Sequence, residues 1–149
     1  MMRSLLLPLL MTLASRLQAE QRCSTEIRSS DQMTYDKSEI RAPRSCASFT
    51  LTLVHPGTLP REVMGHNWVL SRAGDLQSIA ADGSRGGPEH DYLEPGDSRV
   101  LASTRLIAGG ERDSVTFETA RLIAHQDYRL FCSVPFHATL MQGRLLITE

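Results

Sequence analysis

The sequence FCSVPFHATLM, residues 131–141, places three metal-binding side chains in one short stretch. Cys132, His137 and Met141 follow the spacing Cys-x4-His-x3-Met. A thiolate is a soft, strong ligand, imidazole is intermediate, and a thioether is weak. Two imidazoles and one thiolate in a plane, with a long axial bond to methionine, hold copper in blue-copper electron-transfer sites. The stretch therefore predicts a copper site that requires a second histidine from elsewhere in the chain.

The best candidate for that second histidine is His66, within the sequence MGHNW at residues 64–68. Of the remaining histidines, His90 and His125 lie in polar, turn-like sequence, so we expect both to be solvated. His55 precedes Pro-Gly, and two interpretations stay open for it: a structural turn histidine, or a partly buried one close to the metal site.

The rest of the chain is typical of a β protein. Short segments dominate, with turn residues every 8 to 12 positions, which indicates a sandwich or barrel. In residues 49–54 and 114–117, apolar residues alternate with residues of the other face, as in strands with one inward face, and residues 143–148 form the last expected strand. Residues 75–83 break this pattern: Asp75 can cap a helix and Gly83 can end it, so a short helix is predicted there.

Several stretches closely resemble azurins, which are bacterial cupredoxins. They are LPREVMGHNWVL at residues 59–70, residues 131–143, DQM at 31–33, DYL at 91–93 and DSVTF at 113–117. The resemblance runs from about Cys23 to the C-terminus. It implies an all-β fold, a Greek-key cupredoxin β-sandwich of about eight strands with one short helical insertion. It also implies a blue-copper electron-transfer protein that carries one copper ion.

The resemblance also assigns roles at the site. The expected copper-binding residues are His66, Cys132, His137, Met141 and Gly65. The first three form the plane, the thioether is the weak axial ligand, and the glycine contributes its backbone carbonyl from the opposite side. Around them, the backbone N–H groups of Asn67 and Val134 are expected to donate to the thiolate, and the Asn67 side chain is expected to tie the two loops together.

An apolar docking patch around the exposed edge of His137 is implied in the same way. It comprises Met33, Leu59, Val63, Met64, Val134, Pro135 and Phe136. An apolar patch on a soluble monomer often marks an interaction site; the other interpretation is that some of these residues belong to the core. Azurins usually have Gly at position 136. We therefore expect the Phe136 ring to extend the patch and partly cover the route from the metal to solvent.

The first 19 residues are predicted to be a secretory signal peptide, with a short basic start, a Leu-rich run and a small residue at Ala19. Residues 20–149 then form a single cupredoxin domain, exported to the periplasm. Removing the signal peptide leaves 14 basic and 17 acidic side chains, a net charge of −3, so no nucleic-acid partner is implied. No apolar run is long enough to span a membrane.

The chain has three cysteines, and an odd number in an exported protein suggests one disulfide and one free thiol. With Cys132 assigned to the metal, Cys23 is expected to pair with Cys46. The alternative, three free thiols in a cytosolic protein, conflicts with the signal peptide.

The leading functional hypothesis is a monomeric one-electron carrier that is not an enzyme. Its partners would be c-type cytochromes, dehydrogenases or nitrite reductase. One alternative is a copper oxidase or nitrite reductase, which would require a second copper site or an open coordination position. Another is a binding module whose metal site is vestigial or filled by zinc.

Overall fold

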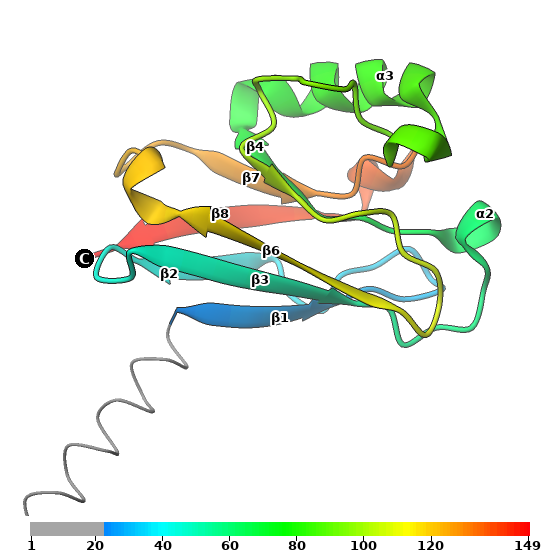
Figure 1. The fold of residues 1–149 in the computed structure, drawn as a ribbon, viewed down its shortest axis with the longest axis horizontal. Helices are drawn as coiled ribbons and strands as arrows, with labels where there is room; N and C mark the ends of the chain where they lie inside the picture. Colours follow the sequence, from blue (N-terminus) through cyan, green and yellow to red (C-terminus); the bar gives the residue numbers. More distant parts are fainter. Residues whose placement is uncertain (1–22) are drawn as a thin grey trace, which may run out of the picture.

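Two β-sheets pack face to face in the computed structural model, which describes residues 23–149 (Figure 1). One sheet has the strand order β1-β3-β6, formed by β1 (Ser24–Arg28), β3 (Ser48–Val54) and β6 (Arg112–Glu118). The other has the order β2-β8-β7-β4-β5, formed by β2 (Glu39–Pro43), β8 (Gln142–Thr148), β7 (Tyr128–Phe131), β4 (Val69–Arg72) and β5 (Ala102–Ser103). The predicted eight-stranded β-sandwich is confirmed.

Alternating side chains explain why these segments form a sandwich. In β3, Phe49, Leu51 and Leu53 are buried and their neighbours are more exposed. β3 pairs in parallel with β1 and antiparallel with β6, where Phe117 lies opposite Phe49 with ring centroids 5.8 Å apart. Trp68, fully buried, stacks near Phe117 at 6.2 Å. The apolar faces of both sheets thus share one core between them.

The predicted helix is present but ends later than expected. Helix α3 spans Leu76–Gly86, follows the 3-10 turn η1 (Ala73–Asp75), and covers one side of the molecule (Figure 1). Gly83 was expected to end it; instead a Cβ there would lie 1.9 Å from the Tyr92 carbonyl oxygen. This glycine therefore serves close packing inside the helix. Gly87, in the left-handed region at φ 69°, ends it instead.

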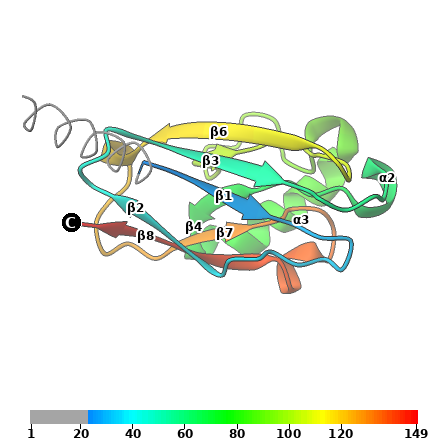
Figure 2. The same cartoon turned by 90° about the horizontal axis from the view of Figure 1, so that it is seen from below.

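The other helical pieces are one-turn elements. They are α2 (Arg61–Met64), η2 (Pro88–His90), η3 (Thr119–Arg121) and η4 (His137–Thr139). α2 and η4 lie at the end of the sandwich away from the C-terminus, as both views show (Figures 1 and 2). Within residues 23–149, no helix is both long and apolar enough to span a bilayer. The predicted signal peptide lies outside the described residues.

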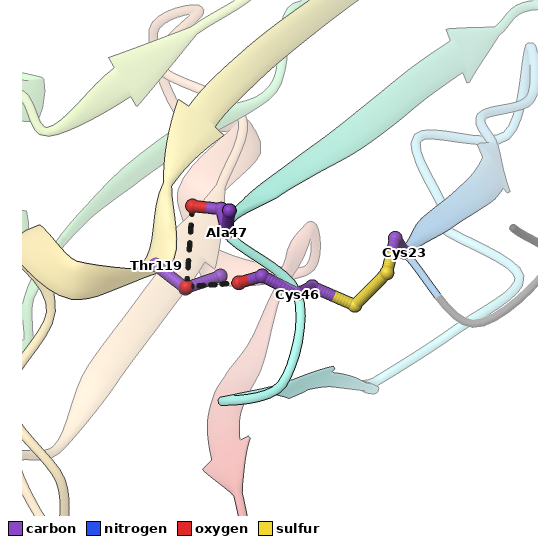
Figure 3. Close-up of a disulfide and its surroundings, with 4 residues drawn as sticks. All are labelled: Cys23, Cys46, Ala47 and Thr119. Carbon is purple, nitrogen blue, oxygen red and sulfur yellow. Dashed lines mark hydrogen bonds between the residues drawn. A yellow bond between two sulfur atoms is a disulfide. The ribbon is translucent and has the colours of Figure 1, made fainter. Parts of the chain in front are cut away.

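A disulfide between Cys23 and Cys46 joins the start of β1 to the turn before β3, as expected (Figure 3). The Cα atoms are 5.5 Å apart. Thr119, the first residue of η3 directly after β6, donates its hydroxyl to the carbonyls of Cys46 and Ala47. The same turn reaches the last strand, where the N–H of Arg44 donates to the Thr148 carbonyl at 2.7 Å. This end of the sandwich is therefore fixed by a covalent bond and by the hydrogen bonds around it.

Candidate metal centre

His66 lies in the extended segment between α2 and β4 and is fully buried. His66 belongs to no strand and makes only an isolated antiparallel bridge to Ile107, through reciprocal backbone hydrogen bonds of 3.1 and 2.8 Å. The bridge is isolated because α2 precedes it directly and β4 begins only at Val69. Even so, the two bonds fix the backbone that carries the imidazole.

Cys132 directly follows β7, and the loop from Cys132 to Met141 closes on itself. The Cys132 N–H donates to the Met141 carbonyl at 3.0 Å, and the Met141 N–H donates to the His137 carbonyl at 2.8 Å. Because the loop starts and ends at the paired strands β7 and β8, its ligand-bearing residues are held by the larger sheet. Cys132 and Met141 are fully buried, and His137 is 5% exposed.

The three nitrogen and sulfur donors form a compact triangle. Cys132 Sγ lies 3.8 Å from His66 Nδ1 and 3.6 Å from His137 Nδ1, and all three donor atoms lie within 4.8 Å of one another. A metal ion bonded at about 2.3 Å to a thiolate and about 2.0 Å to imidazole, with an angle near 120°, requires S–N separations of about 3.7 Å. The observed triangle therefore has the size that one metal ion needs.

The hydrogen bond at the far side of the His66 ring leaves its Nδ1 free for metal. Nε2 lies 2.8 Å from the carbonyl oxygen of Ser30. Since a carbonyl can only accept, Nε2 carries the proton of the neutral ring, and the Nδ1 lone pair faces the triangle. Such a bond on the second ring nitrogen is the usual way in which a ligating histidine is oriented.

Burial shifts the pKa of all three donor groups toward the neutral form. It lowers the pKa of His66 to about 4, against an opposing effect of the Ser30 carbonyl, and it also lowers the pKa of His137. Burial raises the pKa of the Cys132 thiol to about 12, although the N–H groups of Asn67 and Val134 donate to the sulfur and act to lower it. A metal cation must therefore displace the thiol proton, whereas both imidazoles are already neutral.

Asn67 connects the two segments that carry the donors. Its Oδ1 accepts from the Ser133 N–H at 2.9 Å, and its Nδ2 donates to Ser133 Oγ and to the Asp91 carbonyl, both at 2.7 Å. Asn67 and Ser133 are fully buried. The Asn67 side chain thus bridges the two loops, and the N–H groups of Asn67 and Val134 lie at the sulfur.

Gly65, adjacent to His66, is buried and leaves no room for a side chain. A Cβ there would lie 2.5 Å from the Arg61 carbonyl oxygen, which accepts the Gly65 N–H at the end of α2. Glycine is therefore needed for α2 to pack against the ligand segment.

All seven residues of the expected docking patch reach the surface, so none of them is a fully buried core residue. Val63 is 61% exposed and Phe136 is 89% exposed. Leu140, next to Met141 in the same loop, is a further large apolar side chain at the surface, 65% exposed, and was not among the expected patch residues. Its position directly before Met141 in the sequence could have indicated that it lies near the metal centre.

Phe136 has a backbone conformation that favours glycine. Its φ is 71° and its ψ is −14°, in the left-handed region, which is unfavourable for a bulky residue. With 89% of its surface exposed, the ring extends the apolar surface but does not pack down as a cover over the metal. The loop keeps its path because the hydrogen bonds at its base hold it.

Other residues around the site were missed or left open. Ser30, Ser133 and Asp91 bond to ligand-bearing segments through polar atoms that no sequence periodicity reveals. His55 proves fully buried, with its ring 4.7 Å from that of His66 and its Nε2 3.2 Å from Asp31 Oδ1. His90 and His125 are exposed, as expected.

The donor set fits copper in its type 1 arrangement: two imidazole nitrogens and a thiolate sulfur converge, with the thioether of Met141 buried beside them in the same loop. Within residues 23–149, no other cluster of three or more His, Cys, Asp or Glu brings its donor atoms so close together.

Comparisons with known proteins agree with this chemistry. The family described as "Copper binding proteins, plastocyanin/azurin family" matches residues 21–148. An azurin of Bordetella pertussis is 50% identical over 127 residues, covering 85% of this chain and 85% of that protein. An azurin of Pseudomonas aeruginosa is 46% identical over 147 residues, covering 99% of both chains.

Among solved structures, an azurin (Az-iso2) from Methylomonas sp. strain J superposes with a TM-score of 0.83 at 42% identity. The alignment covers 85% of this chain and 98% of that azurin. The match of fold, sequence and donor triangle places this chain in the plastocyanin/azurin family of copper-binding proteins.

Proposed function

We propose that this chain is a periplasmic electron carrier that cycles one copper ion between two redox partner proteins and turns over no substrate. The observation that carries the proposal is the buried donor triangle of His66, Cys132 and His137, whose S–N separations match a single metal ion. Copper, when bound there, supplies a one-electron couple between Cu(I) and Cu(II).

The protein's own residues hold and shield that triangle. His66 and His137 present neutral nitrogens, and Cys132 supplies the thiolate once its proton has left. Met141, fully buried in the same loop, and the backbone carbonyl of Gly65 would be the weaker donors to the same ion. Because these groups are already held by the fold, little rearrangement accompanies a change of charge at the centre, which favours rapid electron transfer.

Electrons would enter and leave through the face around His137, the one metal-centre side chain among the four with measurable exposure. Three of the four large apolar side chains that residues 23–149 expose lie within three positions of a proposed ligand: Val63, Phe136 and Leu140. Such a patch suits brief contacts with apolar surfaces of c-type cytochromes, dehydrogenases or nitrite reductase, because electron-transfer interfaces are small and transient.

The export proposal rests on the predicted signal peptide at residues 1–19 and on the disulfide, since disulfides persist in the bacterial periplasm and are rare in the cytosol. Removal of the leader can be measured as the mass of the protein recovered from a periplasmic extract. A mass that still includes residues 1–19 would contradict this part of the proposal.

The metal assignment is tested by titrating the copper-free protein with Cu(II). We expect an intense absorption band toward the red end of the spectrum that saturates at one equivalent and disappears on one-electron reduction. Zn(II) added first is the control, because it fills the triangle without colour. Weak colour, or saturation at two equivalents, would contradict a single type 1 site.

The docking surface is tested by placing a charge on it. Leu140→Glu should slow electron exchange with a c-type cytochrome by roughly tenfold or more, because an unpaired carboxylate would be desolvated in the contact. Ile123→Glu is the matched control: Ile123 is 60% exposed, similar to Leu140 at 65%, and belongs to no ligand-bearing segment. Equal slowing in both variants would remove the patch from the docking surface.

A further inference from the structure

Asn67 directly follows His66, and its backbone carbonyl oxygen accepts a hydrogen bond from one donor. Asn67 is fully buried, and the Tyr35 hydroxyl donates to its backbone oxygen. Within residues 23–149, no other group donates a hydrogen bond to this oxygen. Leaving a buried carbonyl without a donor is unfavourable, so this hydrogen bond has consequences for the local structure.

The other side of the same peptide unit is also held. The N–H of Trp68 donates to Thr104 Oγ1 at 2.9 Å, and the Thr104 N–H donates back to the Trp68 carbonyl at 2.9 Å. The peptide plane between Asn67 and Trp68 is therefore fixed by two hydroxyl groups that come from distant parts of the chain.

The segment that carries Tyr35 also orients a ligand. An antiparallel bridge between Ser29 and Tyr35 closes residues 29–35 into a loop, and the carbonyl of Ser30 in that loop accepts from His66 Nε2. One loop thus bonds to both His66 and Asn67. Burial, and then the charge of Cys132, raise the pKa of the Tyr35 phenol above its ordinary value, so its hydroxyl keeps the proton that it donates.

Asn67 links this peptide unit to the sulfur and to the copper loop. Its N–H donates to Cys132 Sγ, and its side chain holds Ser133, the next residue of the copper loop. We propose that Tyr35 is a positioning residue of the copper centre: its hydroxyl fixes the Asn67 backbone so that the N–H stays aimed at the Cys132 sulfur, and this contact sets part of the reduction potential. The inference rests on the proposed function.

The direction of the effect follows from the hydrogen bond to sulfur. An N–H that donates to a thiolate withdraws electron density from it, which makes the thiolate a weaker donor and favours Cu(I). Removing the Tyr35 hydroxyl loosens that bond and should favour Cu(II), which lowers the reduction potential.

The test compares Tyr35→Phe with Tyr128→Phe. Tyr128 is also buried, and its hydroxyl accepts the Ile123 N–H at 2.7 Å, so both variants lose one buried hydroxyl contact. At a fixed solution potential, Tyr35→Phe should raise the Cu(II)-to-Cu(I) ratio by roughly two- to fivefold and shift the thiolate-to-copper absorption band. Tyr128→Phe should change stability alone.

Amide hydrogen exchange in the copper-free protein gives a readout that needs no metal. The Asn67 N–H should exchange faster in Tyr35→Phe than in Tyr128→Phe when the two are compared at equal global stability. If neither the exchange rate, the potential nor the band separates the two variants, the positioning role is wrong. Failure of the unaltered protein to form a blue centre would instead overturn the proposed function, and the exchange comparison would still decide the role of Tyr35.

Thr104 offers a second test of the same peptide plane. Thr104→Val removes the hydroxyl and keeps the shape, so it should shift the ratio in the same direction as Tyr35→Phe. Thr104→Ser keeps the hydroxyl and should leave the ratio at its original value. An equal shift in both variants would show that the effect does not depend on the hydroxyl, and it would overturn the role of the hydroxyl contacts.

Discussion

Cys23 and Cys46 join the start of β1 covalently to the turn before β3 (Figure 3). At the metal centre, by contrast, the chain is held together by hydrogen bonds among Asn67, Ser133 and Asp91. Both ends connect segments far apart in sequence. The disulfide restricts the unfolded chain and so adds stability, without specifying any side-chain geometry elsewhere. The hydrogen bonds instead fix the positions of particular atoms in the folded state.

The disulfide end therefore contributes mainly to stability, and the metal-centre end mainly to function. The buried polar groups of the metal-centre end, His66, Asn67, Ser133 and His137, are costly to bury unless each has a partner. The apolar strands and the disulfide offset that cost. Substitutions at the two ends should therefore change different measured quantities.

The largest effect is expected from Cys132→Ser. A serine hydroxyl is a poor copper ligand and gives no thiolate-to-copper absorption, so the blue band should be lost completely. The copper-free variant should stay folded, because its core lies between the sheets and the disulfide remains. Absorption and circular dichroism together check this. Residual blue colour would remove Cys132 from the site, and global unfolding would show that the site carries the fold.

The converse substitution is the double variant Cys23→Ser with Cys46→Ser. The bridge closes a sequence separation of 23 residues, so its removal should lower the free energy of unfolding by about 3 kcal/mol in denaturant titrations. The wavelength of the blue band and the reduction potential should not change. A shifted potential would show that the two ends are coupled.

Acid should lower the free energy of unfolding of the copper-free protein, because His66 at the metal-centre end must become protonated. The pKa of His66 is about 4 in the folded state, below the ordinary value of 6.5, because burial disfavours the charged ring. Between these values the unfolded chain binds a proton that the folded chain does not, so stability is full above pH 6.5 and falls toward pH 4. The expected loss is about 1–3 kcal/mol.

His66→Asn should flatten this pH dependence in denaturant titrations of the copper-free protein. Substitution of the exposed His125 by Asn is the control and should leave it intact. Because burial also lowers the pKa of His137, a smaller pH dependence should remain. A pH dependence of unchanged size in His66→Asn would assign the titration to another group.

The smallest effect is expected at Phe136. Its φ of 71° strains a residue with a side chain, and glycine relieves that strain at some cost in chain entropy. Phe136→Gly should therefore raise the free energy of unfolding by about 0.5–1 kcal/mol. Phe136→Ala removes the same ring but keeps the strain, so it should give no such gain. A gain in both variants would indicate that the exposed ring, not the backbone, is unfavourable.

Sequence patterns predicted the strands and the ligands for physical reasons that the structure makes clear. Alternation in β3 follows from one buried face, and Cys132, His137 and Met141 lie close together because one loop carries them. Spacing along the sequence could not show that His66 lies near this loop, because only the fold brings it 3.8 Å from Cys132. The resemblance of residues 59–70 to azurins supported its choice.

What the sequence could not show is the use of backbone atoms and buried polar side chains. The Ser30 carbonyl orients His66, and the Tyr35 hydroxyl bonds Asn67, but neither contact follows from residue type or spacing. The late end of α3 was missed for a similar reason, because Gly83 packs against the Tyr92 backbone in three dimensions.

The fold, and not the metal, sets the positions of the donor atoms of His66, Cys132 and His137. Crystal structures of the protein with and without copper test this most directly. We expect the Cys132 Sγ separations from His66 Nδ1 and His137 Nδ1, 3.8 and 3.6 Å here, to agree between the two forms within about 0.5 Å. A copper-free structure in which either imidazole has turned away from the sulfur would contradict the claim.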